Sequence, residues 1–296
     1  MLTLGPSTLD HPLANGCPPN WVSAWGDDDH GPWVEIHTGD ARQSLRWIPP
    51  GTFRMGSFET RGAWLLSESP QHPVTISRGF WLFDTPCTQA LWVAVMGENP
   101  SHFQGAKRPV ENVSWDDCQR FLQQLNDRLP GVNLNLPTEA QWEYACRAGT
   151  QTATYAGDLA SSDDGRASGL DEIAWYKVNS EEQTHDVAEK QSNAWGLYDM
   201  LGNVWEWCRD GESRYKDEHA TDPEHGAGSP SADRVIRGGS WAASAQGVRA
   251  AYRIADHPGG RGRSLGFRCS SSGEPGGRPG RGEEPQRSVE AEAEPA

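Results

Sequence analysis

The spacing of apolar and polar residues predicts three helices within residues 88–149. Each begins after a hydroxyl side chain that can cap its first turn, and these caps are Thr88, Ser114 and Thr138. The first and third end at Gly97 and Gly149, and glycine is the usual residue at a left-handed helix end. The second has an apolar face at helical spacing, formed by Trp115, Cys118, Phe121, Leu122, Leu125 and Leu129.

Strand patterns precede the first helix. Residues 33–37, WVEIH, alternate apolar and polar side chains, and we expect a strand that packs onto the main domain. Residues 45–57, LRWIPPGTFRMGS, predict two strands joined by a Pro-Pro-Gly turn, with candidate core residues Trp47, Ile48, Phe53 and Met55. Regular patterns fade after Gly149, so order there must come from tertiary packing or from a bound ion.

Composition favours a turn-rich fold with an aromatic core. The 296 residues include 14 Trp and 33 Gly but only 4 Met, which argues against a helical bundle. We expect one main domain at residues 41–270, preceded by an N-terminal extension at 1–40. Residues 271–296 are rich in Gly, Pro, Glu and Arg, and we expect a disordered acidic tail because they offer little surface to bury.

The net charge, the length of the apolar runs and the first residues argue against several classes of partner and location. At a formal charge of -15, most of the surface repels a nucleic-acid backbone. No apolar run reaches the roughly 18 residues of a membrane span, and the first residues lack the pattern of a signal peptide. We therefore expect a cytoplasmic protein that binds neither nucleic acid nor membrane.

The potential metal-binding side chains are scattered. The six cysteines stand singly, without a CxxC pair, and are expected to be reduced and partly buried. The nine histidines show neither an HExxH motif nor a helical i, i+4 pair. The acidic residues 26–30, GDDDH, are expected to form a solvated loop rather than a cation site.

Several segments together resemble the formylglycine-generating enzyme, or sulfatase-modifying-factor, family. They are WIPPGTFRMGS, GFWLFDTPCTQALWVAVMGENPS, RPVENVSWDDCQRFL, LPTEAQWEYACRAG, NAWGLYDMLGNVWEWC and RVIRGGSW with LGFRC, in the family's order over about residues 45–270. The resemblance implies an α+β fold of the C-type-lectin-like kind. Such a fold has a small antiparallel sheet, flanking helices and much irregular chain.

The resemblance also implies one structural calcium ion in the segment GLYDMLGNVWEWC. Carried over residue by residue, its ligands would be the side chains of Asp199 and Glu206 and the carbonyl groups of Gly202 and Val204. Hard oxygen ligands around a turn suit calcium. The alternative is that Asn203 and Glu206 only donate and accept hydrogen bonds within the loop. The family's second calcium site has no recognisable counterpart in residues 171–193.

The family's enzymes hold copper with two cysteines shortly after the Gly-Gly-Ser turn, and soft thiolates are what cuprous copper selects. Here no cysteine lies between Cys208 and Cys269, and only Ser240 of that site is present. The three-histidine iron site of the sulfoxide synthases, a second branch, is also missing. We therefore expect neither copper nor iron and a non-catalytic protein. An oxidoreductase with a non-standard active site is the alternative.

The segment RGGSWAASAQGVR, with GFR after it, also resembles the variable proteins of diversity-generating retroelements. Mutating the first two bases of an asparagine codon (AAY) yields the residues that stand at several positions of this segment. Arg249, Arg253 and Pro258 are instead expected to belong to the unaltered scaffold. The resemblance implies that residues 242–264 bind a protein or other ligand. The candidate ligand-binding residues are Trp241, Ala242, Ala243, Ser244, Gln246, Tyr252, Ile254, Asp256, His257, Arg261 and Arg263. A further alternative is an interaction domain that acts through its acidic tail.

Overall fold

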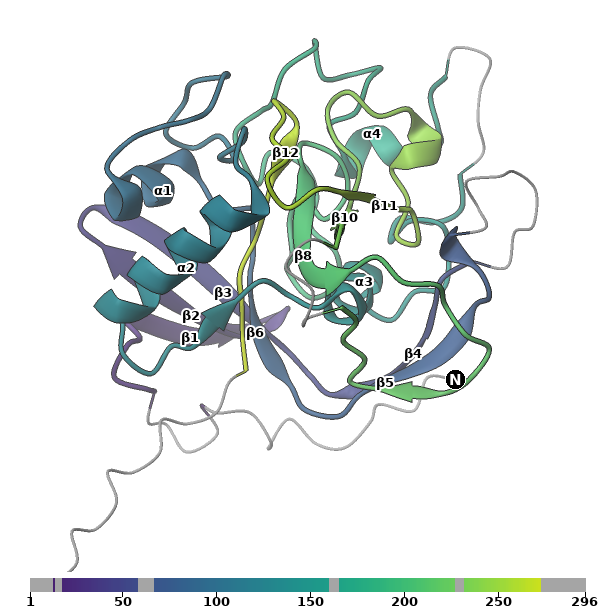
Figure 1. The fold of residues 1–296 in the computed structure, drawn as a ribbon, viewed down its shortest axis with the longest axis horizontal. Helices are drawn as coiled ribbons and strands as arrows, with labels where there is room; N and C mark the ends of the chain where they lie inside the picture. The colour runs from purple at the N-terminus through teal and green to yellow at the C-terminus, as the bar shows by residue number, and fades with distance from the viewer. Residues whose placement is uncertain (1–12, 14–17, 58–66, 160–164, 227–231, 273–296) are drawn as a thin grey trace, which may run out of the picture.

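The largest sheet has six strands in the order β1-β2-β3-β6-β13-β7 (Figure 1). The computed structural model describes Leu13 and residues 18–57, 67–159, 165–226 and 232–272. The strands of this sheet are β1 (Ala24–Asp28), β2 (Gly31–Thr38), β3 (Ala41–Ile48), β6 (Phe80–Phe83), β13 (Ser270–Ser271) and β7 (Leu134–Asn135). Helices α1 (Gln89–Met96) and α2 (Trp115–Arg128) pack against it and close one apolar core.

Two smaller sheets complete the fold. A four-stranded sheet has the order β11-β10-β8-β12, with β11 (Arg253–Asp256), β10 (Arg234–Arg237), β8 (Trp205–Gly211) and β12 (Leu265–Gly266). A three-stranded sheet contains β4 (Gly51–Met55), β5 (His72–Ile76) and β9 (Ala220–Thr221). Helix α3 (Glu139–Arg147) lies between these two sheets, and α4 (Leu170–Ile173) is a single short turn. The α+β class and the C-type-lectin-like architecture are confirmed, although the β8–β12 and β5–β9 pairs are parallel.

All three predicted helix starts are confirmed. The Thr88 side chain accepts a hydrogen bond from the Leu91 amide at the start of α1. Helices α2 and α3 begin with full capping boxes, in which Ser114 pairs with Asp117 and Thr138 pairs with Gln141. Each box satisfies backbone donors that a helix end otherwise leaves unpaired.

The predicted strand-turn-strand at 45–57 is present, but its two strands belong to different sheets. Strand β3 pairs with β2 and β6, whereas β4 pairs with β5, so the turn passes the chain from one sheet to another. Ile48 and Met55 are buried as expected, while Trp47 and Phe53 are only partly buried. The Trp47 ring covers Gly79, where an added Cβ would lie 2.2 Å from it.

The first residues contribute to the main sheet. Strands β1 and β2 lie in the segment expected to be an N-terminal extension. Strand β1 forms one edge of the sheet, and β2 pairs with β3 from Trp33 to Thr38. The 33–37 strand is therefore confirmed. The predicted acidic tail lies outside the described residues from 273 onward. No helix among the described residues has the length and apolar composition of a membrane span.

Candidate functional site

The candidate binding segment begins at a tight glycine turn after β10. Gly238 and Gly239 both have left-handed backbones, with φ of 95° and 76°. A Cβ on Gly239 would lie 2.8 Å from the Gly247 carbonyl oxygen, so only glycine fits this turn. Ser240, which follows, is fully buried, and its hydroxyl accepts a hydrogen bond from the Ala242 amide. Its role in this structure is therefore to hold the turn.

Replacing Gly239 by alanine should destabilise the protein by roughly 2 kcal/mol or more, because the new Cβ combines a strained backbone with a steric clash. Gly247 is the matched control, since a Cβ there would lie 3.5 Å from its nearest neighbour and its φ is not left-handed. In urea unfolding, the free energy of unfolding of Gly247→Ala should lie within about 1 kcal/mol of the value for the parent. Equal losses for the two variants would contradict this view of the turn.

The candidate ligand residues lie at the surface, and most of the residues between them are buried. None of the eleven is buried: Trp241, Ala243 and Tyr252 are half-buried, and Ala242, Ser244, Gln246, Ile254, Asp256, His257, Arg261 and Arg263 are exposed. By contrast, Val248, Ala250 and Arg253 are 0%, 1% and 5% exposed. The segment therefore alternates between outward and inward positions.

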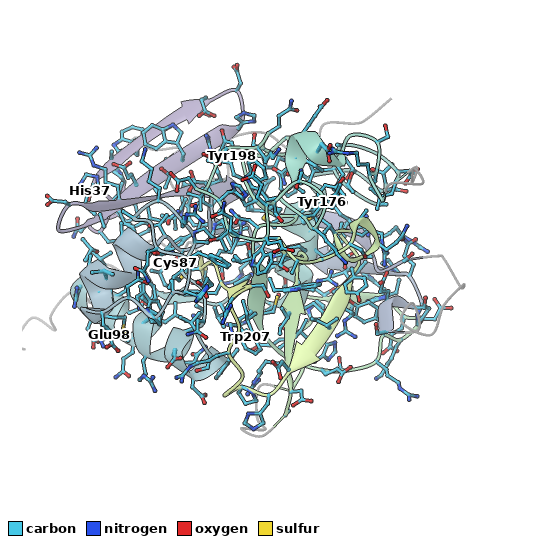
Figure 2. All side chains as sticks on the ribbon, turned by 90° about the horizontal axis from the view of Figure 1, so that it is seen from above. His37, Cys87, Glu98, Tyr176, Tyr198 and Trp207 are labelled. Atoms are coloured by element: carbon cyan, nitrogen blue, oxygen red, sulfur yellow. The ribbon has the colours of Figure 1, made fainter. Side chains whose placement is uncertain are left out.

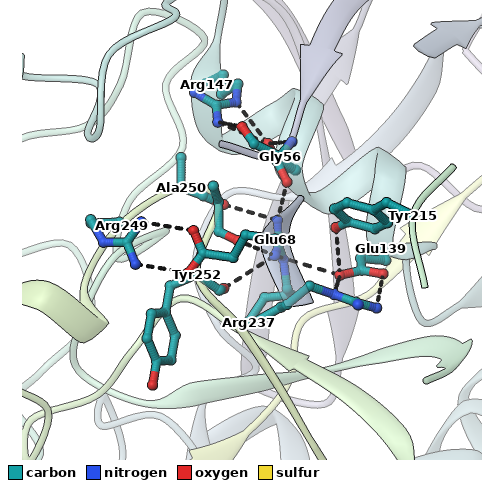
Figure 3. A network of polar contacts seen from close by, with 12 residues as sticks. Gly56, Glu68, Glu139, Arg147, Tyr215, Arg237, Arg249, Ala250 and Tyr252 are labelled. Atoms are coloured by element: carbon teal, nitrogen blue, oxygen red, sulfur yellow. Dashed lines mark hydrogen bonds and ion pairs between the residues drawn. The ribbon is translucent and has the colours of Figure 1, made fainter. Parts of the chain in front are cut away.

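A buried ionic network lies directly under the segment (Figure 3). Arg237, which is fully buried, donates hydrogen bonds to the carbonyl oxygens of Ala250, Ala251 and Tyr252 and pairs with Glu143. The Tyr252 ring points away from this network, while its carbonyl group faces it. One guanidinium thus fixes three consecutive backbone groups of the candidate surface.

Two further arginines of the segment point inward. Arg249 donates to both carboxylate oxygens of Glu68, at 2.8 Å each. Arg253 does the same with Glu139, at 2.6 and 2.8 Å. Bidentate pairs of this kind fix orientation as well as distance. Arg249 and Arg253 are therefore scaffold residues, as the sequence predicted.

The end of the segment is attached to the start of α2. Asp116 and Asn112 donate backbone hydrogen bonds to residues 258 and 262, and Arg261 contacts both carboxylate oxygens of Asp117 at 2.7 and 2.9 Å. Burial acts to raise the pKa of Asp117, but the hydrogen bonds from Ser114 and Arg261 outweigh it and hold that pKa below its ordinary value. Arg261 is therefore exposed to solvent and also anchors the end of the segment to the start of α2.

Two aromatic residues outside the predicted set lie next to it. The Trp205 and Tyr252 ring centroids are 5.8 Å apart, and Phe103 meets Trp241 edge to face at 5.5 Å. Both Trp205 and Phe103 are half-buried. On β8, Trp205 shares a face with Trp207, which is fully buried (Figure 2), and Glu206 lies on the other face. The alternation of Trp205, Glu206 and Trp207 was the pattern in the sequence that could have identified Trp205.

The four predicted calcium ligands lie around one buried turn. Glu206 accepts hydrogen bonds from both Arg268 and Trp142, while Asp199 accepts them from the Ala188 amide and the Asn203 side chain. Gly202 is left-handed, and a Cβ there would lie 2.3 Å from a backbone oxygen. Asn203 thus hydrogen-bonds within the loop, as the alternative supposed, whereas the partners of Glu206 lie outside the loop.

The charge around that turn is unbalanced. Arg268 lies near three carboxyl groups, those of the buried Glu206 and Asp199 and of the half-buried Asp84, which also has Arg46 as a neighbour. Burial raises the pKa of Asp199 to about 6 and that of Asp84 to about 7. In the described parts of the chain, no three His, Cys, Asp or Glu side chains are gathered as metal ligands. Carboxylate oxygens such as those of Asp199 and Glu206 are the kind of ligand that a hard cation such as calcium prefers.

The cysteines that the structure describes are unsuited to copper. All five, Cys87, Cys118, Cys146, Cys208 and Cys269, are buried and without disulfides (Figure 2 labels Cys87). Burial raises the pKa of each thiol, that of Cys146 to about 12. A thiol in such surroundings stays protonated, whereas metal binding requires the thiolate.

The sequence and this geometry agree with one family model. Residues 37–272 match the sulfatase-modifying factor enzyme 1-like domain. The chain belongs to this family. Enzymes and at least one relative described as inactive are both among its similar proteins, so membership does not by itself assign catalysis.

Three curated relatives illustrate that range. The chaperone protein LppX of Paenibacillus barcinonensis is 30% identical over 60% of this chain and 75% of its own length. The formylglycine-generating enzyme of Streptomyces coelicolor is 33% identical over 61% of this chain but 60% of its own length. The inactive Cα-formylglycine-generating enzyme 2 of Bos taurus is 29% identical over 72% and 67%, respectively.

Among solved structures, Treponema denticola variable protein 1 has a TM-score of 0.69 and 30% sequence identity. The similarity covers 81% of this chain and 99% of that one. This chain is therefore similar in fold to that variable protein over nearly all of the variable protein's length.

Proposed function

We propose that this chain is a non-catalytic member of its family that binds a protein partner through residues 242–264. The observation that supports this most strongly is the division within that segment. Most of its candidate binding side chains are exposed, while Arg249 and Arg253 anchor it through buried ion pairs. A surface supported in this way tolerates substitutions at its exposed positions, because exposed changes cost little stability.

The chemistry of the segment supports binding rather than reaction. The residues after the glycine turn are small or neutral, and Ser240 is buried within the turn. Large outward apolar groups that can anchor a partner include Tyr252, Ile254 and the neighbouring Trp205. Aromatic residues at the centre of an interface commonly contribute most of its binding energy.

The similarity to the variable protein of Treponema suggests that the exposed positions differ between copies of the gene. We propose that Ala242, Ser244, Ile254, Asp256 and His257 are the diversified positions. A nearby copy of the coding segment that differs from it only at adenines would support this, and differences spread evenly over all bases would overturn it.

Site-specific photo-crosslinking tests the binding surface. A photoreactive residue would replace Ile254, which is 37% exposed, or Val93 on α1, which is 39% exposed and serves as the matched control. In cells, we expect the position 254 variant to form a defined protein adduct that the position 93 variant does not form. The additional change Tyr252→Ala should reduce that adduct at least about tenfold, because a central aromatic anchor is lost. The same adducts from both positions would contradict the proposal.

We also propose one structural calcium ion held by Asp199, Gly202, Val204 and Glu206. When bound, it would offset the excess of buried carboxylates beside Arg268 and stabilise the turn. Removing it with a chelator should lower the melting temperature by about 5–10 °C, the effect expected for an ion present at about 100 times its Kd.

The control for the calcium prediction is Asp199→Asn, which keeps the size of the side chain but removes its charge. Its melting temperature should be insensitive to chelator and to added calcium. A parent protein that is equally insensitive would show that the Glu206–Arg268 pair stabilises the turn without an ion.

A further inference from the structure

A pocket of about 260 Å³ opens beside the candidate binding segment. Gln246, Arg249 and Ala251 of the segment form one wall, and Arg147, Gln151 and Asp158 contribute to the rest. Its volume lies below the roughly 300–1,000 Å³ of pockets that hold drug-sized ligands. The pocket therefore suits a single functional group, such as the end of a chain or of a side chain.

The network under the pocket contains more guanidinium than carboxylate groups. Four arginines, Arg147, Arg237, Arg249 and Arg253, are ion-paired with three glutamates, Glu68, Glu139 and Glu143. Asp158 also lines the pocket but is exposed to solvent, and burial together with Glu139 raises the pKa of the nearby Asp210 to about 7. A buried cation without a matching anion is costly, so the network favours an added negative charge.

Arg147 can supply part of such a contact. Its guanidinium donates to Glu143 and to the carbonyl oxygens of Thr152 and Gly56. A guanidinium has five N–H donors, and four are used, because Nη2 lies 2.9 Å from Glu143 as well as donating to Gly56. Among the described residues, the remaining donor, on Nη1, has no acceptor and belongs to a side chain that is 5% exposed and lines the pocket.

We propose that this pocket binds a carboxylate group, presented by the partner as an acidic side chain or as a chain terminus. The inference rests on the proposed function, because it assigns the carboxylate to a partner that binds the 242–264 surface. Gln246 lies in both the pocket wall and the candidate binding set, so a ligand on that surface passes the pocket mouth. Because Arg147 and Arg249 are held by ion pairs, the pocket is already organised before a ligand arrives.

The test uses the full chain and two matched pairs of small probes. Glutarate and its neutral diamide report on a side-chain-like carboxylate, and acetylated trialanine with a free or an amidated C-terminus reports on a chain end. Calorimetry should show at least about tenfold tighter binding of the acid in one pair, because a charge-assisted hydrogen bond is lost in the amide. The preferred pair identifies the source of the carboxylate. Equal affinities within both pairs would overturn the inference.

Two nearly isosteric variants of opposite sign strengthen this test. Asp158→Asn removes a negative charge from the pocket and can still accept the Ala153 amide hydrogen bond. Gln151→Glu adds a negative charge at an exposed position of the same pocket. At low salt, Asp158→Asn should tighten binding of the acid about fivefold, and Gln151→Glu should weaken it about fivefold. Binding of the neutral amides should not change in either variant. Changes in the same direction would contradict a charged ligand.

The probes are measured without any partner, so their result is independent of the crosslinking result. Loss of the acid preference with a specific adduct retained at position 254 would remove the pocket inference alone. Acid binding without that adduct would instead remove the proposed partner surface and leave a small-molecule site.

Discussion

Arg237→Met should lower the free energy of unfolding by at least about 3 kcal/mol, because it removes the donors of several buried acceptors at once. Arg237 is fully buried, pairs with Glu143 and donates to the carbonyl oxygens of Ala250, Ala251 and Tyr252. Methionine fills much of the same volume without donors. Urea unfolding followed by tryptophan fluorescence measures the loss.

The control for Arg237→Met is Arg261→Ala at the outer end of the same segment. Arg261 pairs with Asp117, but its side chain is 52% exposed. Exposed pairs of this kind contribute about 1 kcal/mol or less. If both variants lost the same stability, the support of the segment would lie at its surface contacts rather than in the buried network.

Arg268→Met should cost about 3–5 kcal/mol, the usual penalty for breaking a buried ion pair from one side. Glu206 would keep only the Trp142 indole as a donor. The carbonyl oxygens of Phe83 and Tyr198 would also lose their Arg268 hydrogen bonds. The change therefore loosens the contact between β8 and the six-stranded sheet, and unfolding experiments should show this as a lower midpoint.

Calcium provides a second readout for Arg268→Met. The variant lacks the one guanidinium that, among the described residues, pairs with Glu206, so the negative charge near Glu206, Asp199 and Asp84 is less well balanced. Added calcium should then raise the melting temperature of the variant more than that of the parent. A smaller response in the variant would mean that the ion depends on Arg268 for its site.

The helices could be predicted because their signals are local. The capping residues Thr88, Ser114 and Thr138 act within three positions of themselves, and each was found where the sequence placed it. The family motifs likewise predicted the overall fold. The sequence did not separate β3 from β4, because strand pairing depends on partners far away in the chain.

The buried ionic network could not be predicted from the sequence, and the reason is distance along the chain. Glu68 and Arg249 are 181 positions apart, and Glu139 and Arg253 are 114 apart. Neither glutamate belongs to a local pattern that indicates its partner. The inward direction of Arg249 and Arg253 was inferred only from the resemblance, and the structure gives its physical basis.

The candidate surface was predicted correctly as exposed, but its neighbours were missed. Trp205 was considered only as part of the calcium motif, although its alternation with Trp207 indicated a shared face. Phe103 lies in an irregular loop and contacts Trp241 only through the fold. The pocket beside Gln246 is likewise assembled from segments far apart in sequence.

In our proposal, residues 242–264 present tolerant outward positions on an intolerant ionic scaffold. The most direct measurement is a saturation scan of this segment, with every variant scored for folding stability by protease resistance. We expect most substitutions at Ala242, Ser244, Ile254, Asp256 and His257 to stay within about 1 kcal/mol of the parent, and most at Val248, Arg249 and Arg253 to exceed about 2 kcal/mol. Equal intolerance at both sets of positions would contradict the account.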